Sequence, residues 1–468
     1  MSSDFKKHKS SFRDPSGFVF IYQNVLYRQI NQSYKDHYSH FISSGLYDKL
    51  VADNRLIGHE ELQQNLSGDQ AWSLTLKPEF IPFISYPYEW CFDMLKDAAL
   101  TTLEVCLEAL SYGMILKDAT PYNIQFRKGK PVFIDTLSFE KYNPDMPWIA
   151  YRQFSEQFLA PLALSHYFKE PFQKILSNYL EGIPVSMASK LLPIRSKLNL
   201  NVFLHLHLQG KLASRGRKPQ KNSNSFSEKK LRNILISLKD VITAFQFDSP
   251  SGIWSNYYKE ANERSATSND IQPTSTGSYI QIKKEIIEKW IDGHSFQSGI
   301  DIGANEGVFT KLLADKGINM IAADSDHYSV NKLYADSKIT GLFNILPLFI
   351  DFTNPSPGIG VNNTEREPFT ERMKADLVVA LAVIHHFIIE KNISFQQVFA
   401  LLKALGQFVI VEYIPLEDEK IRLMLKRKAV IPPYSEEIFV DAYEEHFVLL
   451  EKLPIGLSGR ILYFLKKR

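Results

Sequence analysis

One ten-residue stretch constrains the fold of this chain more than any other part of its sequence. Residues 298–307 read SGIDIGANEG, and the segment at 308–316 that follows has a helical pattern. The stretch predicts a strand, a tight turn and a helix, because glycine adopts backbone conformations that a Cβ excludes. A helix that begins at such a turn points free backbone N–H groups at a ligand. We therefore expect a nucleotide-like ligand at the carboxyl end of this strand.

The spacing of the acid and the two glycines narrows that expectation. Asp301, Gly303 and Gly307 form Asp-x-Gly-x-x-x-Gly, which differs from the dinucleotide pattern Gly-x-Gly-x-x-Gly. An acid ahead of the turn suits a cationic ligand better than a pyrophosphate. The stretch resembles motif I of the class I S-adenosylmethionine (SAM) methyltransferases, whose acid lies near the methionine amino group. The resemblance implies a SAM site that includes Asp301, Gly303, Asn305 and Gly307.

A second acid follows at the separation along the sequence that is expected of a residue that binds ribose. Asp324 ends the apolar run 318–323 and lies 21 residues after Gly303 (324 − 303). A carboxylate at the end of a second strand can accept hydrogen bonds from both ribose hydroxyls. Asp326 is a neighbouring alternative for the same role.

Two further strand ends carry polar or aromatic side chains. Asp351 and Phe352 follow the apolar run 344–350. In the methyltransferase family the acid at this point contacts the adenine amino group, and the apolar neighbour lies against the ring. His385 and His386 follow the next strand, whose end lies beside the transferring methyl in that family. Either histidine is a candidate general base, and a structural role in the turn is the alternative.

The alternation of strand and helix patterns predicts a parallel α/β sheet. We expect a Rossmann-like, seven-stranded class I methyltransferase domain at 279–468. Residues 209–278 are polar and predict a flexible linker with one amphipathic helix. Residues 1–208 predict a mainly α, α+β domain that shapes the substrate or binds a partner. The whole chain is similar to a bacterial methyltransferase family that includes a nodulation-associated protein and carries the same long N-terminal region.

The N-terminal region contains a second set of polar residues. Asp118 is followed by Asn123 and, after a short hairpin, by Asp135. The set resembles the catalytic loop and metal-binding aspartate of the protein-kinase-like phosphotransferases. The resemblance implies a kinase-like domain at 1–208, with Asp118 as base and Asn123 and Asp135 as magnesium ligands. Leu116 replaces the family's histidine, and no glycine-rich phosphate loop precedes it. A working phosphotransferase and a scaffold that keeps the loop both stay open.

The composition of the chain restricts the other kinds of protein that it could be. The chain has 468 residues, a formal net charge of +2 and two cysteines. The near-balanced charge argues against nucleic acid as a partner, and the two cysteines argue against a disulfide scaffold. The polar, basic start and the lack of a long uncharged apolar run predict a cytoplasmic protein without a membrane segment. No metal is expected outside the kinase-like loop, and the oligomeric state is open.

The sequence therefore predicts methyl transfer from SAM to an unidentified acceptor. A small molecule, a sugar, a lipid and a protein all remain possible acceptors. The sulfonium is a good leaving group, so the protein would mainly supply alignment for in-line displacement. The alternatives are a phosphotransferase or nucleotide-binding module that uses Asp118, Asn123 and Asp135, and a non-catalytic SAM-binding protein.

Overall fold

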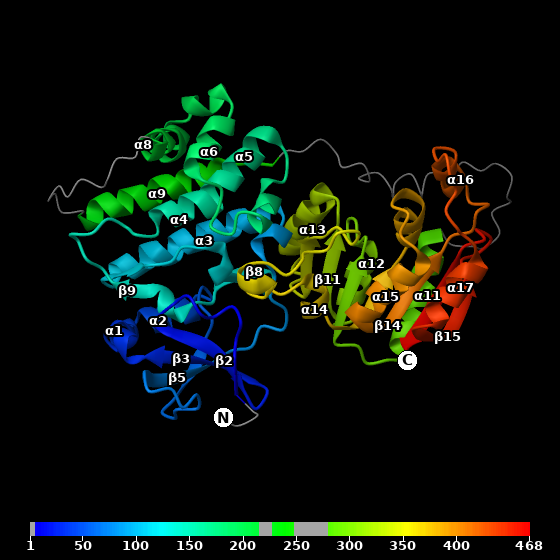
Figure 1. Cartoon of the computed structure of the whole chain (residues 1–468), viewed down its shortest axis with the longest axis horizontal. Coiled ribbons are helices and arrows are strands. Elements are labelled where there is room, and N and C mark those ends of the chain that lie inside the picture. The colour runs from blue at the N-terminus through cyan, green and yellow to red at the C-terminus, as the bar shows by residue number, and fades with distance from the viewer. Residues whose placement is uncertain (1–4, 215–226, 248–278) are drawn as a thin grey trace. The chain divides into compact units, whose positions relative to one another are not determined.

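The computed structural model describes residues 5–214, 227–247 and 279–468, and the chain divides into two compact units (Figure 1). Unit 1 comprises Met1–Ser249 and Gly358–Glu367, and unit 2 comprises Pro250–Pro357 and Pro368–Arg468. Parts of the predicted linker, at 215–226 and 248–278, lie outside the described residues.

Unit 2 is organised around one sheet of seven strands. These are β10 (Ser298–Ile302), β11 (Asn319–Asp324), β12 (Ile345–Phe349), β13 (Ala375–Ala380), β14 (Gly406–Tyr413), β15 (Phe447–Pro454) and β16 (Ile461–Lys467). Their order across the sheet is β12-β11-β10-β13-β14-β16-β15. All neighbouring pairs are parallel except those of β16, which is antiparallel to both of its neighbours. The predicted seven-stranded, Rossmann-like sheet is confirmed.

Helices cover this sheet and enclose its core. They are α11 (Tyr279–Asp292), α12 (Val308–Asp315), α13 (His327–Thr340), α14 (Phe369–Arg372), α15 (Phe395–Leu405), α16 (Glu419–Leu425) and α17 (Glu436–Glu444). The apolar stripe of α11 is buried on the sheet, where the ring of Trp290 stacks on Phe464 of β16 at 5.4 Å between centroids. Among the described residues, no helix combines the length and apolar character needed to span a bilayer.

The strand order creates one switch point in the sheet. The chain runs from β10 outward through β11 to β12 and then returns to place β13 on the other side of β10. The connections at the carboxyl ends of β10 and β13 therefore diverge. Ligands of open α/β sheets bind in the crevice at this position.

Unit 1 is α+β, as the sequence predicts. Its larger sheet is antiparallel with the order β1-β2-β3-β5-β4. The strands are β1 (Phe5–Lys7), β2 (Gly17–Tyr22), β3 (Val25–Asn31), β4 (His59–Leu62) and β5 (Trp72–Pro78). Two small antiparallel pairs follow, β6 (Met114–Leu116) with β9 (Phe139–Lys141), and β7 (Ile124–Arg127) with β8 (Lys130–Phe133).

The helices of unit 1 extend past residue 208, the limit predicted from composition. They are α1 (Lys35–Ser43), α2 (Leu46–Ala52), α3 (Phe92–Ser111), α4 (Tyr151–Phe154), α5 (Ala160–Phe168), α6 (Val185–Leu191), α7 (Leu200–Val202), α8 (Gln209–Ser214) and α9 (Glu228–Ala244). The amphipathic helix predicted in the linker is α9, and it packs along α3. Lys96 of α3 donates a 2.7 Å hydrogen bond to the carbonyl of Phe245, just after α9. The apolar stripe of α9 is thus buried within unit 1.

A short segment from the loop between β12 and β13 also belongs to unit 1. In Gly358–Glu367, the carboxylate of Glu365 accepts two 2.9 Å hydrogen bonds from the guanidinium of Arg13. The guanidinium of Arg366 lies 4.4 Å from the ring centre of Tyr122. The chain therefore leaves unit 2 after Pro357 and rejoins it at Pro368.

Candidate functional site

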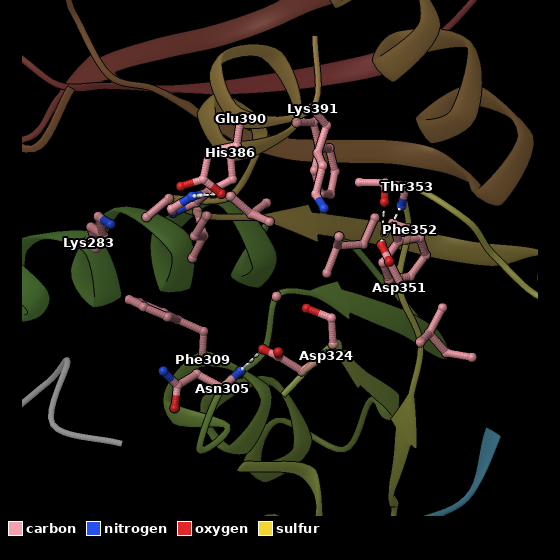
Figure 2. Close-up of a pocket in the computed structure, with 18 of the residues that line it drawn as sticks. Lys283, Asn305, Phe309, Asp324, Asp351, Phe352, Thr353, His386, Glu390 and Lys391 are labelled. Atoms are coloured by element: carbon pink, nitrogen blue, oxygen red, sulfur yellow. Dashed lines mark hydrogen bonds and ion pairs between the residues drawn. The ribbon is translucent and has the colours of Figure 1, made fainter. Parts of the chain in front are cut away.

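A pocket in unit 2 lies at the switch point of the sheet (Figure 2). Its wall is formed by the start of α11, the glycine turn after β10, and the residues that follow β11, β12 and β13. Six of the residues singled out in the sequence line this pocket: Gly303, Asn305, Asp324, Asp351, Phe352 and His386. Asp301, Gly307 and His385 are not part of its wall.

The turn after β10 is tightly packed. Gly303 has a φ of +73°, and a Cβ there would approach a side-chain carbon of Val383 to 2.9 Å. Gly307 has a φ of +77° where α12 begins, and a Cβ there would meet Leu333 at 2.7 Å. Both positions therefore need glycine for backbone conformation as well as for space. Only Gly303 is also exposed to the pocket.

Asp324 is fixed by the backbone on both of its oxygens. The N–H of Asn305 donates to Oδ2 at 2.7 Å, and the N–H of Asp326 donates to Oδ1 at 2.8 Å. Burial raises the pKa of Asp324, while these hydrogen bonds oppose the rise. Asp326 instead accepts from the N–H of Tyr328 as the N-cap of α13. The structure thus separates the two neighbouring acids, with Asp324 in the pocket wall and Asp326 outside it.

Asp351 and Phe352 form another part of the wall, as Figure 2 shows. The N–H and the hydroxyl of Thr353 both donate to Oδ1 of Asp351, at 2.9 and 2.7 Å. The ring of Phe352 is buried and meets Phe369 edge to face at 5.8 Å between centroids. These contacts hold a carboxylate and an aromatic face in fixed positions beside the cavity.

Asp301 lies beneath the turn. It is 3% exposed, and Oδ2 accepts a 2.6 Å hydrogen bond from the hydroxyl of Thr310 on α12. Burial raises the pKa of Asp301 to about 6, against the effect of that hydrogen bond. Asp301 therefore contacts α12 through Thr310 and does not line the pocket.

The two histidines differ in their surroundings. His386 lines the pocket, and its Nδ1 lies 3.3 Å from a carboxylate oxygen of Glu390 one turn later. His385 is 4% exposed, and its Nδ1 has no hydrogen-bond partner among the described residues. Burial lowers the pKa of both rings. Both are therefore neutral imidazoles at pH 7, and only His386 is positioned to meet a ligand.

The pocket wall also includes Lys283, which the sequence reasoning missed. Lys283 on α11 is 3% exposed, and its ammonium donates a 2.5 Å hydrogen bond to Glu412 at the end of β14. Tyr279 also donates to Glu412, and Arg460 donates to Tyr279 at 2.7 Å. Lys283 lies in the apolar stripe of α11. A lone charge in an apolar stripe is a signal that the sequence offered, since lysine is rarely buried without a function or a partner.

In unit 1 the structure brings together the kinase-like set. The amide of Asn123 donates to Ser138 at 3.0 Å and lies 3.5 Å from Oδ2 of Asp135. Asp135 also forms an ion pair with Arg28 on β3 and accepts from the hydroxyl of Ser138. Arg28 ends the run Val-Leu-Tyr-Arg in β3, which does not match the kinase pattern Val-Ala-x-Lys, so no signal in the sequence pointed to it.

Asp118 completes this set. It lies after β6, and the amide of Gln153 is 3.5 Å from its Oδ1. Burial raises the pKa of Asp118, and the nearby charge of Asp135 raises it further. No group of three or more His, Cys, Asp or Glu side chains within the described ranges is arranged to hold a metal ion.

Known proteins that resemble this chain include two solved structures and a curated relative. No protein-family model matches it. The bifunctional kinase-methyltransferase WbdD is 18% identical, with a TM-score of 0.29 over 40% of this chain and 38% of WbdD. The N-methyltransferase NodS from Bradyrhizobium japonicum WM9, solved with S-adenosyl-L-homocysteine, is 13% identical, with a TM-score of 0.31 over 45% of this chain and 98% of NodS.

A curated relative matches over nearly the full length. The nodulation protein NoeA of Rhizobium meliloti (strain 1021) is 32% identical over 464 residues, which cover 97% of this chain and 94% of NoeA. The resemblance to a nodulation-associated family is thus confirmed, and the chain belongs to the family of NoeA.

Proposed function

We propose that this protein is a SAM-dependent methyltransferase whose active site is the pocket of unit 2. One observation carries the proposal: Asp324 and Asp351, at the ends of neighbouring strands, line a single pocket beside the Gly303 turn. A seven-stranded sheet with one antiparallel strand supports it. The family relationship to NoeA is consistent with it.

The chemistry of the wall fits the parts of SAM. A vicinal diol donates two hydrogen bonds, and the carboxylate of Asp324 is fixed at the pocket to accept them. An aromatic amine needs an acceptor and an apolar surface, which Asp351 and Phe352 provide together. Asn305 and Gly303 bring the backbone of the turn close to the sulfur-bearing end. In this proposal Asp301 and Gly307 shape that turn from outside the wall.

The protein's own contribution is alignment and exclusion of water. When bound, SAM supplies a methyl group on a positively charged sulfur. The pocket residues hold the donor so that an acceptor approaches the methyl in line with the breaking bond. His386 is neutral and lines the pocket, so it is the candidate base for an acceptor that must lose a proton. The acceptor classes to test are a small molecule, a sugar, a lipid and a protein.

Calorimetric titration of the full chain with SAM tests the proposal. We expect SAM binding in the micromolar range and at least a tenfold loss of affinity for the Asp324→Asn variant. Absence of SAM binding to the native protein would remove the proposal. Incubation with labelled SAM and candidate acceptors then separates an enzyme from a non-catalytic SAM-binding protein, because only the enzyme transfers label.

A phosphotransferase or nucleotide-binding activity of unit 1 is the second candidate. Asn123 donates a hydrogen bond to Asp135, and Asp118 lies close enough for the charge of Asp135 to raise its pKa, which favours this candidate. The ion pair of Asp135 with Arg28 opposes it, because the guanidinium takes a carboxylate oxygen that a metal ion would need. Titration with Mg-ATP decides between them: binding that Asp135→Ala abolishes supports the second activity, and absence of binding removes it.

A further inference from the structure

Three polar positions follow one another along the pocket. Figure 2 shows Asp351 and Lys283 at opposite ends, with Asp324 between them in that view. The three parts of SAM are joined in the order adenine, ribose and charged methionine part. If Asp351 meets the adenine and Asp324 meets the ribose, the methionine part extends toward Lys283.

Lys283 has hydrogen-bonding capacity left for a ligand. An ammonium carries three N–H donors, and Glu412 accepts one of them at 2.5 Å. The ring of Tyr279 lies 4.3 Å from Nζ and shields one side of the cation. Glu412 is itself shared with Tyr279 and Arg460, so its charge is not reserved for Lys283.

Two other charged groups at or near the pocket, Asp301 and Lys391, do not take this role. Asp301 is turned into the protein toward Thr310, and it is an anion. Lys391 lines the pocket, but Figure 2 shows it toward Phe352 and Asp351, at the end assigned to the adenine. Burial of a charge is costly, and at this wall Glu412 offsets the cost, as a ligand anion would.

We propose that Lys283 binds the carboxylate of the methionine part of SAM, with Glu412, Tyr279 and Arg460 fixing its position. The inference rests on the proposed function and adds a residue on α11 to the cofactor site. It makes α11 part of that site, whereas the sequence patterns placed the site entirely at 301–386. The lowered pKa of Lys283, about 8, agrees with a cation that an anionic ligand would stabilise.

The decisive experiment compares SAM with decarboxylated SAM, which lacks only the carboxylate. Both ligands are titrated calorimetrically into the full chain and into Lys283→Met. We expect the variant to lose about tenfold to a hundredfold in SAM affinity, the range of a hydrogen bond between charged groups. Its affinity for decarboxylated SAM should change less than about twofold. The matched control is Lys284→Met on the same helix, because Lys284 does not line the pocket.

Two outcomes would overturn the inference: equal loss of both ligands in Lys283→Met, or no loss of either. Native protein that binds neither ligand would instead refute the proposed function. Because Lys283→Met leaves the charge of Glu412 buried, the double variant Lys283→Met/Glu412→Gln is tested in parallel. It removes both charges and must show the same selective loss, and Lys283→Arg must restore part of the preference for SAM.

Discussion

The backbone N–H of Asn305 donates a 2.7 Å hydrogen bond to Oδ2 of Asp324, which ties the glycine turn after β10 to the end of β11. The same carboxylate accepts from the N–H of Asp326 through Oδ1. The bond fixes the carboxylate proposed for the ribose relative to the turn proposed for the methionine part. A ligand that spans both would thus meet two preset surfaces, and little ordering would be needed when it binds.

This relationship predicts different effects for the two neighbouring acids. Asp324→Asn should weaken SAM binding at least tenfold, since an amide replaces one acceptor with a donor that faces backbone N–H groups. Asp326→Asn should change SAM affinity less than about threefold, because Asp326 caps α13 outside the pocket. Titration calorimetry on both variants measures this, and a larger effect at Asp326 would transfer the ribose role to it.

Asp301 should make stability depend on pH. Its folded-state pKa is raised from 3.8 to about 6, so the native state binds its proton more tightly than the unfolded state does. The stability contributed by this group is therefore present below pH 3.8 and lost as pH rises through about 6. Above that pH the buried charge costs about 3 kcal/mol.

The variant Asp301→Asn isolates that cost. Its melting temperature should exceed the native value at pH 7.5, and the difference should disappear near pH 4. Thr310 can still donate to the amide oxygen, so packing is retained. If Asp301 serves the methionine amino group through its charge, SAM affinity falls in the same variant. A variant that melts below the native protein at pH 7.5 would show that the charge stabilises the fold.

Proton uptake should accompany SAM binding if Lys283 meets its carboxylate. Burial lowers the pKa of Lys283 to about 8 despite Glu412, and Arg460 and Lys420 lower it further. A bound carboxylate favours the ammonium, so at pH 8 a fraction of a proton is taken up. Binding enthalpies measured at pH 8 should therefore differ between phosphate and Tris buffers. Lys283→Met should remove the part of the proton uptake that is due to Lys283. If the enthalpy difference between the two buffers is unchanged in this variant, another group takes up the proton.

Arg28 and Asp135 should be coupled in the stability of unit 1. Their side chains are 15% and 14% exposed, so either single truncation leaves a mostly buried charge. Arg28→Met and Asp135→Asn should each destabilise the protein by about 3 kcal/mol. The double variant should be more stable than the sum of the two single effects predicts. Thermal denaturation of the four proteins measures this, and strictly additive effects would show that the pair contributes no interaction energy.

The sequence by itself determined the sheet of unit 2 and most of the residues proposed to bind SAM. An apolar run followed by an acid, as at Asp324 and Asp351, predicts the end of a strand. Parallel strands end at the same edge of the sheet, so the two acids lie there together. The glycine spacing at Gly303 likewise follows from backbone sterics that are local to the chain. Such features can be predicted from the sequence because each depends on residues that are close together in the chain.

The tertiary structure alone decided which charges face the pocket. Asp301 carries the strongest motif, yet packing turns it toward Thr310, while Lys283 enters the wall because Glu412, 129 residues later, holds its ammonium. In unit 1, Arg28 meets Asp135 in the same way across a long separation. Side-chain pairing over such distances depends on how the elements dock, and no periodicity in the sequence records it.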